Sequence, residues 1–419
     1  TIADVSTSAS LALKHLCCQC PEEMSHFADK LVAIVNSGSD DLKSPERLDI
    51  LEGLAEVIAT QAPENAIQAM QHVSALSVNY LLSIQASSPQ QVQQTCYALD
   101  CLVVLLRYGG HRDKTFPHPM IPVIQNVWSS FEKVISLYAE VPRVIERIAK
   151  ISKQMIREFG SFTEPFIVPL IELLVKGYRR KPTSSFMYAA GIAAARYGEE
   201  AKYVPLFLNM LEEFCAVTFS FLNSPEAFTD NPLIVEDLFT MGDRCVKAMP
   251  EALVPSPVFA SLFECACFGS LVEHQQASHA LLLFVENSIL LGVRNPKRDL
   301  LRPHIESAMA KGGQMLVNNI VAGMAGQLPT TVLISRTDGS LEMALDAVCQ
   351  FIQSDEQLRA VLQTALKSQG CAHVNTALAS WFVEGVLSSS HSASSRFSDY
   401  SRIIEQFSDR ARLRLNRKV

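Results

Sequence analysis

Apolar side chains recur at intervals of three and four residues along almost the whole chain, and this periodicity most constrains the fold. Such spacing places the apolar residues of a segment on one face of an α-helix. The strict alternation typical of strands is nearly absent, so the sequence predicts an all-α protein. Helices are expected at residues 2–18, 22–36, 44–61, 64–85, 89–107, 120–138, 143–159, 163–179, 184–197, 203–222, 231–248, 257–270, 275–293, 299–325, 340–353, 355–368, 374–387 and 396–412.

The prolines reveal an internal repeat. The segments Phe116-Pro-His-Pro119-Met-Ile-Pro122 and Phe162-Thr-Glu-Pro165-Phe-Ile-Val-Pro169 resemble each other, and their phenylalanines lie 46 residues apart. Because proline is tolerated in the first turn of a helix, we expect one proline to mark the start of each pair of helices. The prolines near helix starts, at a mean spacing of about 45 residues, are Pro122, Pro169, Pro205, Pro255 and Pro303.

This period indicates the architecture. Units of roughly 40 to 47 residues with two helices each are typical of HEAT and armadillo repeats. One helix pair cannot cover its own apolar face, so successive pairs stack into a superhelix. We therefore expect residues 1–419 to form a single right-handed HEAT-repeat solenoid of about nine stacked antiparallel helix pairs. An irregular globular all-α protein is the alternative.

Composition excludes several classes of protein. The net charge of −7 argues against a general nucleic-acid binder, which needs a basic face. No apolar run looks long enough for stable membrane insertion, because Glu286 and Asn287 interrupt the most apolar stretch. The eleven cysteines, an odd number, favour reduced thiols in a cytosolic or nuclear protein.

No catalytic or cofactor-binding motif occurs, so we expect neither an enzyme nor a cofactor. The cluster Cys17 to Cys20 has a CxxC spacing, but no second ligand pair follows it, and packing in a core is favoured over a metal or redox site. His111 and His118 flank a polar loop; a metal there would need two further ligands, and a packed loop is the favoured interpretation.

The stretch from Val141 to Gly160 contains a line of cations. At about 100° per residue, all five fall on one helical face, opposite an apolar stripe. Two carboxylates leave a local charge of +3 in a chain of −7. Cations about one turn apart suit an extended anion such as a phosphorylated serine repeat or a nucleic-acid backbone, whereas an ordinary solvated face is the alternative. The basic ladder consists of Arg143, Arg147, Lys150, Lys153 and Arg157.

A second basic segment, residues 410–418, closes the chain and is interpreted as a solvated final helix and tail.

Several segments carry a resemblance to a known family. They are the ladder at 143–157, ARYGEEAKYVPLFLNML at 195–211, NPLIVEDLFTMGDRCVKAMP at 231–250 and SPERLDILEGLAEVIA at 44–59. Their order along the chain is similar to the C-terminal, cargo-binding half of the transportin-SR branch of the importin-β (karyopherin-β) nuclear transport receptors. None is a catalytic signature.

The resemblance implies a HEAT-repeat import receptor that shuttles between cytoplasm and nucleus. Such receptors capture SR-type splicing factors and related RNA-binding proteins, including RGG-type cargo, contact nucleoporin FG repeats and release cargo to Ran-GTP. The main Ran-binding surface lies in N-terminal repeats that this chain is expected to lack. A static helical scaffold or coat-like adaptor, binding acidic partners or an anionic membrane surface, is the alternative function.

The resemblance also implies a site. In the family an arginine-rich helix on the concave surface holds the phosphorylated Arg-Ser domain of the cargo. That motif maps without gaps onto the five residues of the ladder, which are the predicted cargo-binding residues. Lys150 and Lys153 depart from it, since lysine keeps the charge but loses the planar bidentate geometry of arginine. Preference for phosphoserine over other acidic or Arg-rich cargo is therefore left open.

Overall fold

The computed structural model describes residues 2–36, 44–85, 88–329, 339–390 and 396–416. Every regular element within these ranges is a helix, which confirms the predicted all-α class. The chain divides into two compact units, Thr1–Ala193 and Ala194–Val419, and each is described by itself. The single solenoid of about nine repeats stays a prediction.

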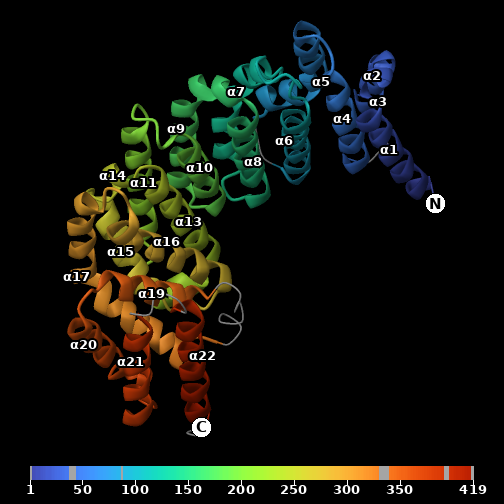
Figure 1. Cartoon of the computed structure of the whole chain (residues 1–419). Coiled ribbons are helices and arrows are strands. Elements are labelled where there is room, and N and C mark those ends of the chain that lie inside the picture. Colours follow the sequence, from blue (N-terminus) through green and yellow to red (C-terminus); the bar gives the residue numbers. More distant parts are fainter. Residues whose placement is uncertain (1, 37–43, 86–87, 330–338, 391–395, 417–419) are drawn as a thin grey trace. The chain divides into compact units, whose positions relative to one another are not determined.

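Unit 1 consists of two rows of helices that alternate along the chain, so that consecutive helices pair across the rows (Figure 1). Within each row, every helix packs against the next member. The first row contains α1 (Ile2–Gln19), α4 (Ser44–Ile58), α6 (Pro89–Tyr108) and α8 (Pro142–Glu158). The second row contains α3 (Ala28–Asn36), α5 (Pro63–Ser83), α7 (Ile121–Leu137) and α9 (Glu164–Arg180). Further elements are α2 (Pro21–Met24), η1 (Ser25–Phe27), η2 (Gly160–Thr163) and α10 (Ser184–Tyr197), which contains the division between the units.

The predicted helix at 22–36 is wrong as a single element. It is divided into α2, η1 and α3, because a 3₁₀ turn begins at Ser25. The Ser25 hydroxyl donates to the Glu22 carbonyl at 2.6 Å, a local hydrogen bond that competes with regular helical pairing.

Unit 2 repeats the two-row arrangement, again with contacts between successive members of a row. One row contains α11 (Val204–Phe219), α15 (Pro257–Gly269), α17 (Arg298–Ala322) and α20 (Asp355–Leu366). The other contains α13 (Pro232–Ala248), α16 (Gln275–Arg294), α19 (Ser340–Phe351) and α21 (Thr376–Ser390). The remaining elements are α12 (Pro225–Asp230), α14 (Pro250–Leu253), η3 (Gly323–Gln327), η4 (Gln369–Cys371) and α22 (Arg396–Leu415), of which the short α12 and α14 were not predicted.

The prolines do not mark the repeats as simply as expected. Pro122 and Pro205 lie in the first turns of α7 and α11, as predicted. Pro169 and Pro303, however, lie inside α9 and α17, and Pro255 lies between two helices. Prolines also begin neighbouring helices of both rows, such as α5, α6 and α8. Proline therefore marks helix starts in general, because any helix tolerates it in the first turn.

Helix α16 is, among the described residues, the one helix that is long and apolar enough to meet a length-and-hydropathy criterion for a membrane span. It packs against α13, α15, α17 and α19, and more than half of it is buried. Asn287 on this helix donates to Asp243 of α13 at 2.7 Å, and Asp243 also pairs with Lys247 at 2.7 Å. Burial in a helical core accounts for the hydropathy of α16.

The basic segment that begins at Arg410 is not merely solvated, which corrects that prediction. Helix α17 ends in the π-turn η3, where Gly326 adopts a φ of +124°, a conformation that glycine reaches without strain. Arg412 of α22 donates to the Gly323 and Leu328 carbonyls at 3.0 and 2.8 Å. Arg410 lies over the Trp381 ring. These side chains fix α22 to the rest of unit 2, whereas residues 417 and 418 lie outside the described residues.

Candidate anion-binding helix

Helix α8 has the two faces that its sequence predicts. Proline occupies its first turn, where a missing N–H costs nothing, and the helix ends at Glu158. Its apolar side packs against α6 and α7. The apolar residues predicted to form the buried stripe, Val144, Ile148, Ile151, Met155 and Phe159, are all buried. This stripe fixes the rotation of the helix, so the basic ladder faces away from the core.

Three cations of the ladder form an exposed row. Arg143, Lys150 and Arg157 recur every seven residues, which places them nearly in line along the helix. At a rise of about 1.5 Å per residue, neighbouring members are about 10.5 Å apart along the axis. Their side chains make no hydrogen bond or ion pair with any part of the chain that the structure describes. The row therefore presents three cations that form no ion pair within the described residues.

The other two cations are engaged by neighbouring helices. The Nε of Arg147 lies 2.9 Å from Oδ2 of Asp100 on α6, and its Nη1 donates to the Arg143 carbonyl at 2.7 Å. The Nζ of Lys153 donates to the Tyr188 hydroxyl on α10 at 3.0 Å. Both side chains are half-buried. Asp100 thus neutralises part of the ladder and orients Arg147, whereas Tyr188 holds Lys153 without neutralising it.

Sequence reasoning missed Asp100 and Tyr188 as partners of the ladder. The periodicity of α8 describes one helix, whereas these partners come from residues 47 and 35 positions away along the chain. The repeat predicts that α6 and α8 pack against each other within a row. It does not predict that the carboxylate of Asp100 faces Arg147.

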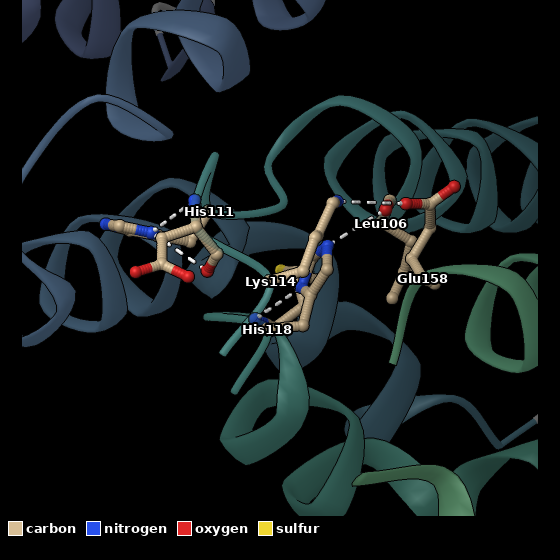
Figure 2. A network of polar contacts seen from close by, with 7 residues as sticks. Leu106, His111, Lys114, His118 and Glu158 are labelled. Carbon is tan, nitrogen blue, oxygen red and sulfur yellow. Dashed lines mark hydrogen bonds and ion pairs between the residues drawn. The ribbon is translucent and has the colours of Figure 1, made fainter. Parts of the chain in front are cut away.

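The loop between α6 and α7 contains both histidines that were considered as metal ligands (Figure 2). Nδ1 of buried His118 accepts from the Met120 N–H at 3.1 Å, so Nε2 carries the proton and donates to the Leu106 carbonyl at 3.0 Å. Nδ1 of half-buried His111 accepts from the Asp113 N–H at 3.1 Å. Both ring nitrogens of His118 are thus engaged in hydrogen bonds, and this residue holds its part of the loop against α6.

The burial of His118 makes the stability of the fold depend on pH. Burial lowers its pKa from 6.5 to about 4, an effect that the positive charge of Lys114 reinforces and the hydrogen bond to Leu106 opposes. The unfolded chain therefore binds this proton first as the pH falls. Stability is fully present above about pH 6.5 and is lost progressively down to about pH 4, by about 3 kcal/mol at most.

We expect His118→Gln to remove this dependence, because an amide keeps one acceptor and one donor but does not titrate. The urea midpoints of the natural protein and the variant should be compared between pH 7.5 and pH 4. The natural protein should lose more stability than the variant over this range. Parallel curves would show that His118 does not titrate between the two values.

The cysteines of the cluster differ in their burial. Cys17 is buried against α4, where it lies beside Gly53, whereas Cys20 is exposed. Across the residues that the structure describes, no group of three or more His, Cys, Asp or Glu side chains could hold a metal ion. Core packing is therefore the right interpretation of Cys17.

Comparisons with known proteins find similarity to transportin and importin proteins. Residues 118–222, which include the whole ladder, match the model of a family described as the Transportin-3/Importin-13 fourth TPR domain. Transportin MOS14 of Arabidopsis thaliana is 22% identical over 374 residues, covering 87% of this chain and 38% of the relative. Importin-13 of Rattus norvegicus is 19% identical over 288 residues, covering 63% of this chain and 29% of the relative.

A solved structure entitled "Importin13 cytosolic state" superimposes with a TM-score of 0.80 at 15% identity. The match covers 97% of this chain and 45% of that one, and it shows that the fold is the stacked helical-repeat fold of the HEAT type. The chain spans less than two fifths of the length of the curated relatives it matches.

These findings show that the chain shares a helical-repeat fold with a solved importin structure and sequence similarity with transportin and importin proteins. Residues 118–222 resemble a domain of the transportin and importin proteins, and the sequence similarity to these proteins extends over most of the chain.

Proposed function

We propose that this chain is the cargo-binding part of a nuclear import receptor of the transportin-SR branch. Its cargo is an SR-type splicing factor or a related RNA-binding protein with an acidic, phosphorylated or Arg-rich tail. The receptor shuttles between cytoplasm and nucleus, contacts FG nucleoporins and releases its cargo when Ran-GTP binds, mainly through repeats that lie N-terminal to this part.

The observation that carries the proposal is the exposed row of Arg143, Lys150 and Arg157 on α8. An extended peptide advances about 3.3 to 3.6 Å per residue, so the spacing of about 10.5 Å corresponds to roughly three peptide residues. A chain with several phosphoserines can therefore meet all three cations at once. Arg143 and Arg157 can bind phosphate in a bidentate manner, whereas Lys150 supplies a point charge.

Two further observations support the proposal over a static scaffold. The family model covers residues 118–222 and therefore the complete ladder. In addition, Lys150 is the one exposed position of the ladder at which lysine stands in place of arginine, since Lys153 is bound to Tyr188. A row with arginine at both ends retains bidentate phosphate geometry where a peptide enters and leaves it.

The proposal is tested with the full-length protein as bait in nuclear extract, with and without GTP-locked Ran, and with bound proteins identified by mass spectrometry. We expect SR-type factors to be enriched without Ran and depleted when Ran-GTP is present. Retention of the same proteins in both samples would contradict a receptor that releases its cargo to Ran. A bound set without acidic or Arg-Ser tails would contradict the cargo class.

A further inference from the structure

The two ends of the ladder differ in charge. The N-terminal end holds Arg143 and Arg147, and two carboxylates lie near these arginines, Asp100 on α6 and Glu146 on α8. All four groups act on the thiol of Cys96: burial raises its pKa most, the two arginines lower it and the two carboxylates raise it further. Charges of opposite sign therefore balance at this end, whereas the other three cations of the ladder follow along the rest of α8.

Asp100 is the one acidic residue of α6, and its ion pair with Arg147 leaves hydrogen-bonding capacity on both side chains. Oδ2 of Asp100 accepts from Nε of Arg147 at 2.9 Å, whereas Oδ1 accepts no hydrogen bond from the residues that the structure describes. Nη1 of Arg147 donates to the Arg143 carbonyl, and Nη2 donates to no acceptor in the same described ranges. Both of these unengaged atoms reach solvent. The pair therefore offers a ligand one anionic acceptor and one cationic donor.

A carboxylate beside a row of cations favours a ligand that carries both charges. A purely anionic peptide gains nothing from Asp100, because the carboxylate repels phosphate. A peptide with a cation next to its phosphates gains an attractive contact there. Arginine suits this position, since its planar guanidinium carries several N–H donors in the geometry that a carboxylate accepts.

The spacing at this end of α8 matches a peptide in which arginine and phosphoserine alternate. Arg143 and Arg147 are separated by about 6 Å along the helix axis, at about 1.5 Å per residue. Two residues of an extended peptide advance about 6.6 to 7.2 Å, so successive phosphoserines of an alternating peptide can meet these two arginines. The side chain between them points to the opposite side of the extended peptide. For a peptide that lies along α8 with α6 beside it, that side holds Asp100.

We propose that Asp100 and Arg147 form a subsite that binds one arginine and the phosphoserine next to it in the cargo peptide. Oδ1 of Asp100 accepts from the guanidinium of the peptide's arginine, and Nη2 of Arg147 donates to the neighbouring phosphate. The exposed row of α8 binds further phosphates of the same peptide. This inference rests on the proposed function and narrows its ligand to a peptide of alternating arginine and phosphoserine rather than any acidic tail.

The test uses the full-length protein and two fluorescent peptides with the same phosphoserines. One peptide has arginine between them, and the other has citrulline, which keeps the shape of arginine without its charge. Asp100→Asn keeps the size of the side chain and an acceptor for Arg147, so the variant should fold. We expect it to lower the affinity ratio of the arginine peptide to the citrulline peptide about 5-fold, which the loss of one partly exposed ion pair can supply. Because a shift of Arg147 would weaken both peptides equally, the ratio isolates the contact with arginine.

Asp49→Asn is the matched control. Asp49 on α4 pairs with Lys14 at 3.1 Å, and its side chain is 27% exposed, against 25% for Asp100. This variant removes the same charge and should leave the ratio unchanged. If the natural protein binds both peptides but Asp100→Asn does not change the ratio, or if both variants lower it equally, the subsite is overturned while the proposed function stands. If the natural protein binds neither peptide, both are overturned.

Discussion

Replacing Arg143, Lys150 and Arg157 together by glutamate is expected to lower the affinity for a phosphorylated Arg-Ser peptide by about 100-fold or more at 0.15 M salt. Each exposed phosphate contact contributes about 1 kcal/mol under these conditions, and reversal adds repulsion to the loss of attraction. The three side chains make no hydrogen bonds or ion pairs with the described parts of the chain. The variant should therefore keep its fold, and fluorescence anisotropy with the labelled peptide measures the loss directly.

The choice of these three cations follows from their surroundings. Reversal of Arg147 would also break its ion pair with Asp100, and reversal of Lys153 would break its hydrogen bond to Tyr188. Variants at those positions would confuse a loss of binding with a shift of α8 against its neighbours. Substitutions in the exposed row change peptide binding without breaking a contact that holds α8 against its neighbours.

A matched triple variant controls for net charge. Lys30, Lys133 and Arg180 are exposed cations on three other helices of unit 1. Their replacement by glutamate changes the net charge by the same amount but should reduce peptide binding by less than about 3-fold, because exposed charges farther away than about 8 Å are screened. Equal losses in both triple variants would mean that only the total charge matters. The assignment of α8 as the binding helix would then be refuted.

Replacing Arg412 by methionine is expected to destabilise unit 2 by about 2 to 4 kcal/mol. Its guanidinium donates to the Gly323 and Leu328 carbonyls, where η3 ends, and hydrogen bonds from a charged group contribute about 1.5 to 3 kcal/mol each in favourable cases. Methionine fills a similar length but leaves these acceptors unsatisfied. Ser408, which donates to the Met324 carbonyl at 2.9 Å, would remain as the one nearby bond from α22 that the structure describes.

Hydrogen exchange gives the local readout for this variant. Amides of residues 323–329 and of α22 should exchange faster in Arg412→Met, whereas unit 1 should be unaffected. Arg414→Met is the control, since Arg414 is exposed on the same helix and its loss should cost less than about 0.5 kcal/mol. Equal protection in the two variants would show that Arg412 does not fix the end of the chain.

The sequence alone was sufficient for the positions of most helices. Apolar periodicity is a local property, and helices such as α8 and α13 begin and end within one residue of the predicted limits. The exception at residues 22–36 arose because a serine hydroxyl bonded to a nearby carbonyl, which apolar spacing does not report. Proline was a good marker of helix starts and a poor marker of repeats, because helices of both rows use it.

By itself, the sequence determined that five cations lie on one face of one helix, because helical geometry follows from spacing alone. Only the tertiary structure decided which of them are available. Asp100 and Tyr188 come from other helices and engage Arg147 and Lys153, and this leaves three cations in a straight row. In the same way, a basic C-terminal segment was evident from the sequence, whereas the capping role of Arg412 depends on carbonyls more than 80 residues away. The charge of each side chain follows from the sequence, but whether that side chain can bind a ligand depends on its contacts with distant segments.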